Sequence, residues 1–227
     1  MKLQKETESH GKWYQDACGT AFAMELVGER WSILIVRELM LGGRRFSDLR
    51  ASLPGISAKV LTERLTGLEE AGVLMRRKLP PPAATQVYEL TEWGYLAEPA
   101  IQELGRWAAR SREHNPQLPL SPVSLMLSMR TMLVPEATAG VEAKVGFDIA
   151  GETFLAHLRD GQLPVRRGEM DGADAVIRAS APLPVLRVIY GNQTLEAIEA
   201  EGGLRVEGDR EAARRFCSVF SLPDKVD

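Results

Sequence analysis

The chain has 227 residues, of which 44% are hydrophobic and 26% are charged, the composition of an ordinary globular protein with material for a substantial core. Its formal net charge of −3 argues against a general nucleic-acid binder. No apolar run approaches the roughly 20 residues that span a bilayer, and the N-terminus lacks the apolar segment of a secretory signal. We therefore expect a cytoplasmic protein that does not associate with membranes.

The cysteines and histidines exclude two further kinds of protein. Cys18 and Cys217 are too few and too far apart for a disulfide framework, and their number fits a reducing compartment. The histidines are scattered and have no Cys or carboxylate neighbours at ligand spacing, which predicts no metal site. No nucleophile motif, phosphate loop or glycine-rich dinucleotide fingerprint occurs. The sequence thus predicts neither an enzyme nor a bound cofactor.

Four helices are expected in the first 72 residues. Apolar residues recur at helical spacing over about 16–27, and the run 31–41 is apolar nearly all round, as in a central buried helix. A short helix beginning near Phe46 follows. The fourth helix, 57–72, has Ser57 as its N-cap and a glycine at its end.

Two strands and a further helix complete the first half. The segments 73–79 and 86–90 have strand character, and the proline-rich loop 80–85 between them is too long for a tight turn. A strand, a protruding loop and a return strand directly after a helix-turn-helix form a wing. Thr91 then caps a helical stretch in which Pro99 predicts a kink or a restart. These elements together predict a winged helix-turn-helix domain.

The helix 57–72 has the side chains that a DNA-recognition helix needs. Its leucines line one face, and short polar and basic side chains occupy the opposite face, where they can reach base edges and phosphates. Residues 44–78 hold eight Lys/Arg against four Asp/Glu. From this pattern alone, an ordinary solvated helix is an equally good interpretation. The candidate DNA contacts are Arg44, Arg45, Ser57, Lys59, Thr62, Arg64, Arg76, Arg77 and Lys78.

The stretch from Cys18 to Trp107 contains a series of short motifs, in this order: the early Cys18, GERW (28–31), RRFSDLR (44–50), LPGIS (53–57), KVLTERL (59–65), LEEAG (68–72), YELT (88–91) and the closing Trp107. With these motifs it resembles the HxlR-type family of bacterial regulators. The resemblance implies a winged helix-turn-helix homodimer that binds inverted-repeat operators in double-stranded DNA near promoters, more often as a repressor than as an activator. Gly19 departs from the family, which often has proline after the cysteine.

The last helix of the first half predicts the dimer interface. Trp93, Ile101, Leu104 and Trp107 give it more apolar surface than one small domain can cover. The family resemblance implies that the first and last helices hold the two copies together. We therefore expect a two-fold dimer built from this helix and the helix at 16–27.

Cys18 is the candidate redox site. It lies near the start of a helix, where the helix dipole lowers the pKa of a thiol and favours its reactivity. Some HxlR-type regulators sense oxidants or electrophiles through a cysteine at this place. The alternative is a small buried core residue, which we favour because no second cysteine lies nearby in the sequence. Cys217 is expected in the core.

The proline-rich segment 114–122 is the best candidate for a linker. We expect a DNA-binding and dimerisation domain over 1–114, a linker over 115–122 and a second domain over 123–227. The second half begins with a Met-rich helix and the alternating strand 141–149. A hairpin, further strands and later helices follow, which makes its fold class α+β.

Residues 124–220 contain the Asp160-Gly161 hairpin, the Gly191-Asn192 break and the run 202–209. With these features they are similar, more loosely, to the sterol carrier protein-type lipid-binding fold. It implies a sheet-and-helix domain with a tunnel for a lipid-like or other small apolar ligand. A filled core is the alternative interpretation of the same residues. The candidate ligand-binding residues are Met126, Met129, Met132, Leu133, Phe147, Leu155, Ile189 and Phe216.

These patterns predict a two-domain, dimeric transcription regulator. An apolar ligand in the second domain would shift the dimer between forms that can and cannot bind DNA. Two alternatives remain open. One is a carrier of lipids or other hydrophobic ligands whose N-terminal half only dimerises. The other is a regulator that senses redox state through Cys18, with the second domain as a structural extension.

Overall fold

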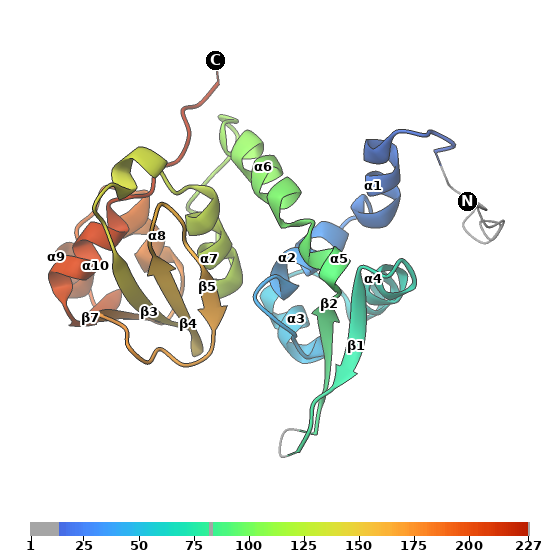
Figure 1. Ribbon diagram of the computed structural model, residues 1–227, viewed down its shortest axis with the longest axis horizontal. Helices are drawn as coiled ribbons and strands as arrows, with labels where there is room; N and C mark the ends of the chain where they lie inside the picture. The colour runs from blue at the N-terminus through green and yellow to red at the C-terminus, as the bar shows by residue number, and fades with distance from the viewer. Residues whose placement is uncertain (1–13, 82–83, 227) are drawn as a thin grey trace. The chain divides into compact units, whose positions relative to one another are not determined.

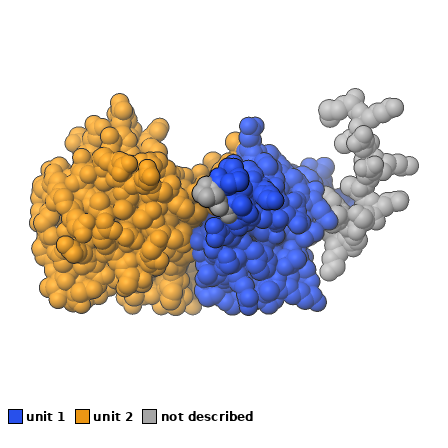
Figure 2. Space-filling view, turned by 90° about the horizontal axis from the view of Figure 1, so that it is seen from below, with its two compact units in different colours: residues 1–36, 44–94 blue, residues 37–43, 95–227 orange. Residues whose placement is uncertain are grey.

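The computed structural model describes residues 14–81 and 84–226 (Figure 1). Its contacts divide the chain into two compact units, one of residues 1–36 and 44–94 and one of residues 37–43 and 95–227 (Figure 2). Helix α2 (Ser32–Leu39) thus begins in the first unit and ends in the second. The predicted domains, 1–114 and 123–227, are parts of the chain that we expect to fold independently of each other. Compact units defined by contacts do not test this, so the domain boundaries stay a prediction.

The first unit contains the helices and the two-stranded wing that the sequence predicts. Besides the start of α2, its elements are α1 (Gly19–Val27), α3 (Phe46–Ser52), α4 (Ala58–Glu70), β1 (Leu74–Lys78), β2 (Gln86–Leu90) and α5 (Glu92–Tyr95), whose last residue belongs to the second unit. Leucines from α3, α4 and β1 are almost fully buried and form much of its core: Leu49, Leu61, Leu65, Leu68 and Leu74.

Local signals in the sequence determine where α4 begins and ends. The Ser57 hydroxyl accepts a hydrogen bond from the N–H of Val60 at 3.2 Å, as an N-cap does. Gly72, at a φ of +73°, takes the left-handed conformation just after the helix. β1 follows at once and pairs antiparallel with β2 along its whole length. The predicted recognition helix and wing are therefore confirmed as structural elements.

The helical stretch after Thr91 is interrupted, as Pro99 predicts. The Thr91 hydroxyl accepts the N–H of Gly94 at 3.0 Å at the start of α5. Helix α6 (Glu98–Ala109) then starts afresh with Pro99 in its first turn, where a missing N–H costs no hydrogen bond. α6 belongs to the second unit.

The second unit is an α+β fold around one five-stranded sheet. The strand order is β5-β4-β3-β6-β7. The elements after α6 are α7 (Pro122–Thr131), the 3-10 helix η1 (Pro135–Thr138), β3 (Ala143–Ile149), β4 (Glu152–Leu158), β5 (Val165–Arg167), β6 (Ala175–Ala179), α8 (Leu183–Ile189), α9 (Leu195–Ala200), β7 (Leu204–Gly208) and α10 (Arg210–Cys217).

The first three strands of the sheet form the predicted meander. β4 pairs antiparallel with both β3 and β5. Asp160 and Gly161 make the turn between β4 and β5 with φ values of +50° and +71°, and Arg159 and Gln162 exchange backbone hydrogen bonds across it. β6 then pairs with β3 in parallel, and β7 returns antiparallel beside β6.

Helix α10 packs on one face of this sheet, across β3, β6 and β7. The ring of Phe216 lies 5.8 Å from that of Phe147 and 5.3 Å from that of Phe220, centroid to centroid. All three side chains are buried, so this face of the sheet carries the core of the second unit.

Seven of the eight candidate ligand-binding residues are between 0 and 8% exposed, and Leu133 is half-buried. Leu155 pairs with Gly146, the neighbour of Phe147 on β3. Because successive residues of a strand point to opposite faces, Leu155 lies on the other face of the sheet from Phe147. The prediction that both residues line one interior is wrong.

Candidate nucleic-acid interface

Helix α4 buries one face and exposes the other. Its three leucines are no more than 1% exposed, whereas Lys59, Thr62 and Glu63 are exposed on the opposite side. The Lys59 ammonium lies 3.9 Å from the Glu63 carboxylate, and its side chain is 86% exposed. The Thr62 hydroxyl donates to the carbonyl of Ala58 at 2.9 Å, so its oxygen remains available as an acceptor. This face offers donors and acceptors that an incoming polar surface could use.

Two predicted contacts on α4 already have partners within the chain. Ser57 accepts the capping hydrogen bond from Val60. The Arg64 guanidinium lies 3.0 Å from the Glu29 carboxylate and donates to the carbonyl of Arg30 at 3.3 Å. Arg64 therefore joins α4 to the segment between α1 and α2.

The wing presents three basic side chains. The Arg76 guanidinium lies 2.6 Å from the carboxylate of Glu69, which raises the pKa of Arg76. The Arg77 guanidinium lies 2.7 Å from the carboxylate of Glu89, and its side chain remains 54% exposed. Lys78 is exposed at the end of β1. Because these cations lie at the surface, their carboxylate partners can be exchanged for phosphates.

Arg44 and Arg45 differ in what they can reach. Arg44 is only 6% exposed, and its backbone N–H and carbonyl pair with those of Tyr88 at 2.9 and 2.8 Å. Arg45 is exposed at the start of α3. Burial of the Arg44 side chain contradicts its place among the surface contacts, and we retain only Arg45 of this pair.

We did not predict the acidic partners of these arginines from the sequence. Glu29, Glu69 and Glu89 each hold one of them. With the strands in register, an acidic residue near the basic one on the neighbouring strand would have indicated the pair of Arg77 with Glu89. Glu29 had no comparable signal, because its partner lies 35 residues further along the chain.

Large apolar side chains are exposed on the two helices predicted to form a dimer. On α6, Leu104 is 46% exposed and Trp107 is 74% exposed. α1 has no buried residue, and its Phe22 and Met24 are 46% and 39% exposed. Each helix thus presents apolar surface that its own unit leaves uncovered.

Cys18 is exposed at the N-cap of α1. Interactions with the backbone N–H groups of Thr20 and Ala21 lower the pKa of its thiol, although the side chain makes no well-formed capping hydrogen bond. Our preference for a buried core cysteine at this position was wrong. Cys217 is buried, as predicted, and burial raises the pKa of its thiol to about 12.

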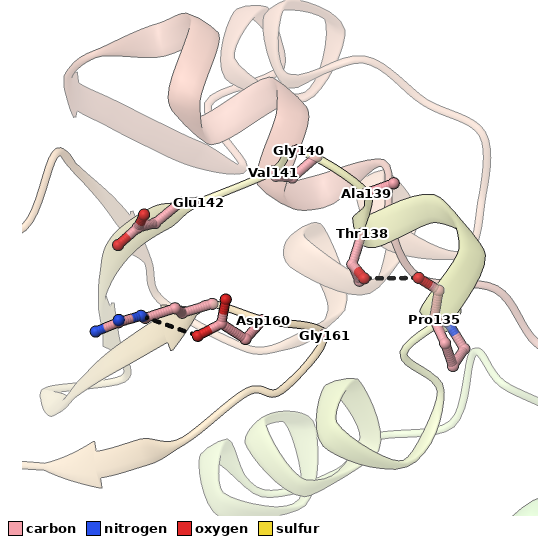
Figure 3. Close-up of a pocket in the computed structure, with 9 residues that line it drawn as sticks. Pro135, Thr138, Ala139, Gly140, Val141, Glu142, Asp160 and Gly161 are labelled. Carbon is pink, nitrogen blue, oxygen red and sulfur yellow. Dashed lines mark hydrogen bonds and ion pairs between the residues drawn. The ribbon is translucent and has the colours of Figure 1, made fainter.

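A cavity of about 530 Å³ lies in the second unit, beside the start of β3 and the turn that follows β4 (Figure 3). The segment from η1 to the residue before β3 lines one side, and the turn between β4 and β5 lines the other. Arg159 donates to the carboxylate of Asp160 at 3.1 Å there. None of the eight candidate ligand-binding residues lines this cavity, and its charged lining differs from that of a tunnel for an apolar ligand.

The described residues contain neither a candidate metal site nor a candidate membrane-spanning helix. Between residues 14 and 81 and between residues 84 and 226, no cluster of three or more His, Cys, Asp or Glu side chains could hold a metal ion. No helix in this described part has the length and apolar character needed to cross a membrane.

The first half of the chain matches known helix-turn-helix proteins. The profile of the HxlR-like helix-turn-helix family matches residues 26–116. The uncharacterized HTH-type transcriptional regulator YvaP of Bacillus subtilis (strain 168) is 40% identical over 86 residues, which is 38% of this chain and 80% of YvaP. The HTH-type transcriptional regulator YodB of the same organism is also 40% identical over 86 residues, covering 38% of this chain and 77% of YodB.

A solved structure of the reduced form of the transcriptional regulator YodB from B. subtilis aligns with 43% of this chain and 97% of its own, at 36% identity and a TM-score of 0.39. Residues 117–227 lie outside the family match. The identity to YvaP and YodB over more than two thirds of each shows that the chain belongs to the HxlR-like helix-turn-helix family.

Proposed function

We propose that the chain regulates transcription by binding inverted-repeat operator DNA as a homodimer, with repression as its effect. The observation that carries this proposal is the two-sided character of α4. Its leucines are buried, and its opposite face exposes Lys59 and Thr62 immediately before a wing that exposes Arg77 and Lys78. A hydrophobic-ligand carrier has no use for such a face.

The proposed contacts divide into two kinds. Lys59 and Thr62 have the reach and the hydrogen-bonding groups to contact base edges when α4 lies in the major groove. We expect the exposed Arg45, Arg77 and Lys78 to bind phosphates on either side of these base contacts. At Arg77 a phosphate would replace the carboxylate of Glu89, an exchange of one anion for another at an exposed site.

Substitutions at the two kinds of contact are expected to differ in their effect on specificity. Lys59→Ala and Thr62→Ala should each cost about 1–3 kcal/mol in binding to the preferred operator and should change the preferred bases. Arg77→Ala should weaken binding to all sequences alike and reduce the salt slope by about one phosphate contact. The measurement is a series of fluorescence-anisotropy titrations at several salt concentrations, with sequences enriched by the wild-type chain.

Lys144→Ala is the matched control, because Lys144 is an exposed lysine on β3 of the second unit. It should leave the affinity unchanged. Wild-type affinity in all three interface variants, at every salt concentration, would contradict the assignment of α4 and the wing.

Control by an apolar ligand remains a prediction. Met126, Met129 and Phe216 are 0% exposed, and the cavity described above lies elsewhere. Full burial of these side chains favours a filled core over a tunnel, and the Phe216 substitution considered in the Discussion separates the two.

Control by oxidants or electrophiles through Cys18 is a second candidate function. It is favoured by the exposure of Cys18 at the start of α1 and by the lowered pKa of its thiol. A lowered pKa increases the fraction of thiolate at a given pH, and the thiolate is the species that reacts.

We expect iodoacetamide to modify Cys18 near neutral pH in the folded protein and to leave Cys217 unmodified. The rate at Cys18, followed by mass spectrometry over a series of pH values, should rise with a midpoint below that of a cysteine in a short peptide. Cys217 is the internal control, since burial raises its pKa to about 12. Equal rates at the two cysteines, or a midpoint at Cys18 no lower than that of the peptide, would show that the Cys18 thiol is not activated by a lowered pKa.

A further inference from the structure

Segments from much later in the chain hold both ends of α6. At its first turn, the Glu98 carboxylate pairs with the Arg130 guanidinium of α7. Arg130 also donates to the carbonyls of Leu163 at 3.3 Å and Val165 at 3.5 Å, at the start of β5. Glu98 and Arg130 are only 23% and 21% exposed, so this ion pair is partly shielded from solvent. One guanidinium therefore connects α6, α7 and the edge of the sheet.

A second contact joins the last turn of α6 to the end of α7. The Arg106 guanidinium donates to the carbonyl of Thr131, the last residue of α7, at 2.6 Å. The carbonyls at the end of a helix lack partners within it, and a cation there is favourable.

The C-terminal segment, residues 218–226, contacts the other end of α6 through Lys225 and Val226. The Lys225 ammonium donates to the carbonyls of Ala109 at 2.9 Å, Ser111 at 2.9 Å and His114 at 3.3 Å. An ammonium has three N–H donors, and each has an acceptor here. The N–H of Val226 also donates to the carbonyl of Arg110 at 2.9 Å. Lys225 thus lies where the negative end of the helix dipole favours a cation.

The exposed Leu104 and Trp107 lie between these two attachment points. We propose that Arg130 and Lys225 are positioning residues through which α7, β5 and the C-terminal segment set the orientation of α6, and with it the geometry of the dimer and the spacing of its two DNA half-sites. This inference rests on the proposed function, in which the apolar face of α6 meets a second copy. A change in α7, β5 or the C-terminal segment would then alter DNA binding without any contact with DNA.

The test uses the full chain with Arg130→Gln or Lys225→Met. Controls are Arg205→Gln, which changes an exposed arginine on β7, and Lys144→Met on β3. Two quantities are measured: the dimer Kd by sedimentation, and the ratio of affinities for operators whose half-sites are moved apart by one or two base pairs. We expect each positioning variant to raise the dimer Kd about tenfold, as for loss of a charged hydrogen bond. Each should also bring the ratio of affinities for the differently spaced operators closer to one. The controls should change neither.

A purely structural role predicts a different result. The variants would then unfold at a lower temperature but keep the wild-type dimer Kd and spacing preference, and that result would overturn the inference. Lys225 is exposed, so Lys225→Met provides the test even if Arg130→Gln does not fold. Arg130→Lys keeps the charge but loses the bidentate guanidinium. Its ratio of affinities for the differently spaced operators should lie between that of the wild type and that of Arg130→Gln.

Failure of the proposed function gives its own result. A wild-type dimer that binds no DNA selectively would refute the proposed function alone, and the dimer Kd values would still test the role of Arg130 and Lys225. A wild-type monomer would refute both.

Discussion

We expect Trp107→Asp to leave the protein monomeric at micromolar concentration and to abolish operator binding. Trp107 is 74% exposed in the single chain, and Leu104 beside it on α6 is 46% exposed. A second copy would cover this surface, and buried tryptophans contribute most to such interfaces. We expect the substitution to cost at least about 2 kcal/mol of association, a factor of roughly 30 in the dimer Kd. Placing a carboxylate in the apolar interface adds to this cost.

Sedimentation velocity over a concentration series measures this effect. Leu118→Asp is the matched control, because Leu118 is an exposed leucine outside every helix of the second unit and is 62% exposed. It should leave the dimer intact. A Trp107→Asp protein with the dimer Kd of the wild type would show that α6 does not form the interface.

We expect Phe216→Ala to lower the free energy of unfolding of the second unit by about 3–5 kcal/mol, the usual cost of removing a buried phenylalanine. Phe216 is 0% exposed, and two aromatic rings pack against it. In a filled core the substitution leaves a cavity, whereas at the wall of an open tunnel it only widens a space that already exists. The size of the loss therefore separates a core from a tunnel.

Urea unfolding followed by circular dichroism measures that loss, with Leu183→Ala on α8 as the control, because Leu183 is 38% exposed. A loss below about 1 kcal/mol, together with a rise in the melting temperature of the wild type on adding fatty acids, would support the tunnel instead.

Much of the fold could be predicted because the ends of its elements carry local signals. Ser57 and Gly72 delimit α4, Pro99 marks the restart at α6, and Asp160-Gly161 makes the turn of the hairpin. Each depends on backbone conformation within a few residues, which a sequence displays directly.

Pairings between distant residues could not be predicted in this way. The parallel pairing of β3 with β6 joins two strands that have β4 and β5 between them in the sequence, and no local pattern specifies this pairing. The acceptors of Lys225 lie more than 110 residues away in the sequence. Cys18 was predicted to be a core residue because no second cysteine lies nearby in the sequence. The distance to another cysteine carries no information about burial, and α1 has no buried residue in the single chain.

Binding of the wild-type chain to a library of random DNA duplexes tests the proposed function most directly. The sequences enriched by selection are titrated at several salt concentrations. We predict enriched inverted repeats, one dimer bound per repeat, and a logarithm of affinity that falls linearly with the logarithm of salt, by about 0.9 for each phosphate contacted. A library with no enriched sequence, or equal affinity for enriched and random duplexes, would contradict the proposed regulator and favour a carrier whose N-terminal half only dimerises.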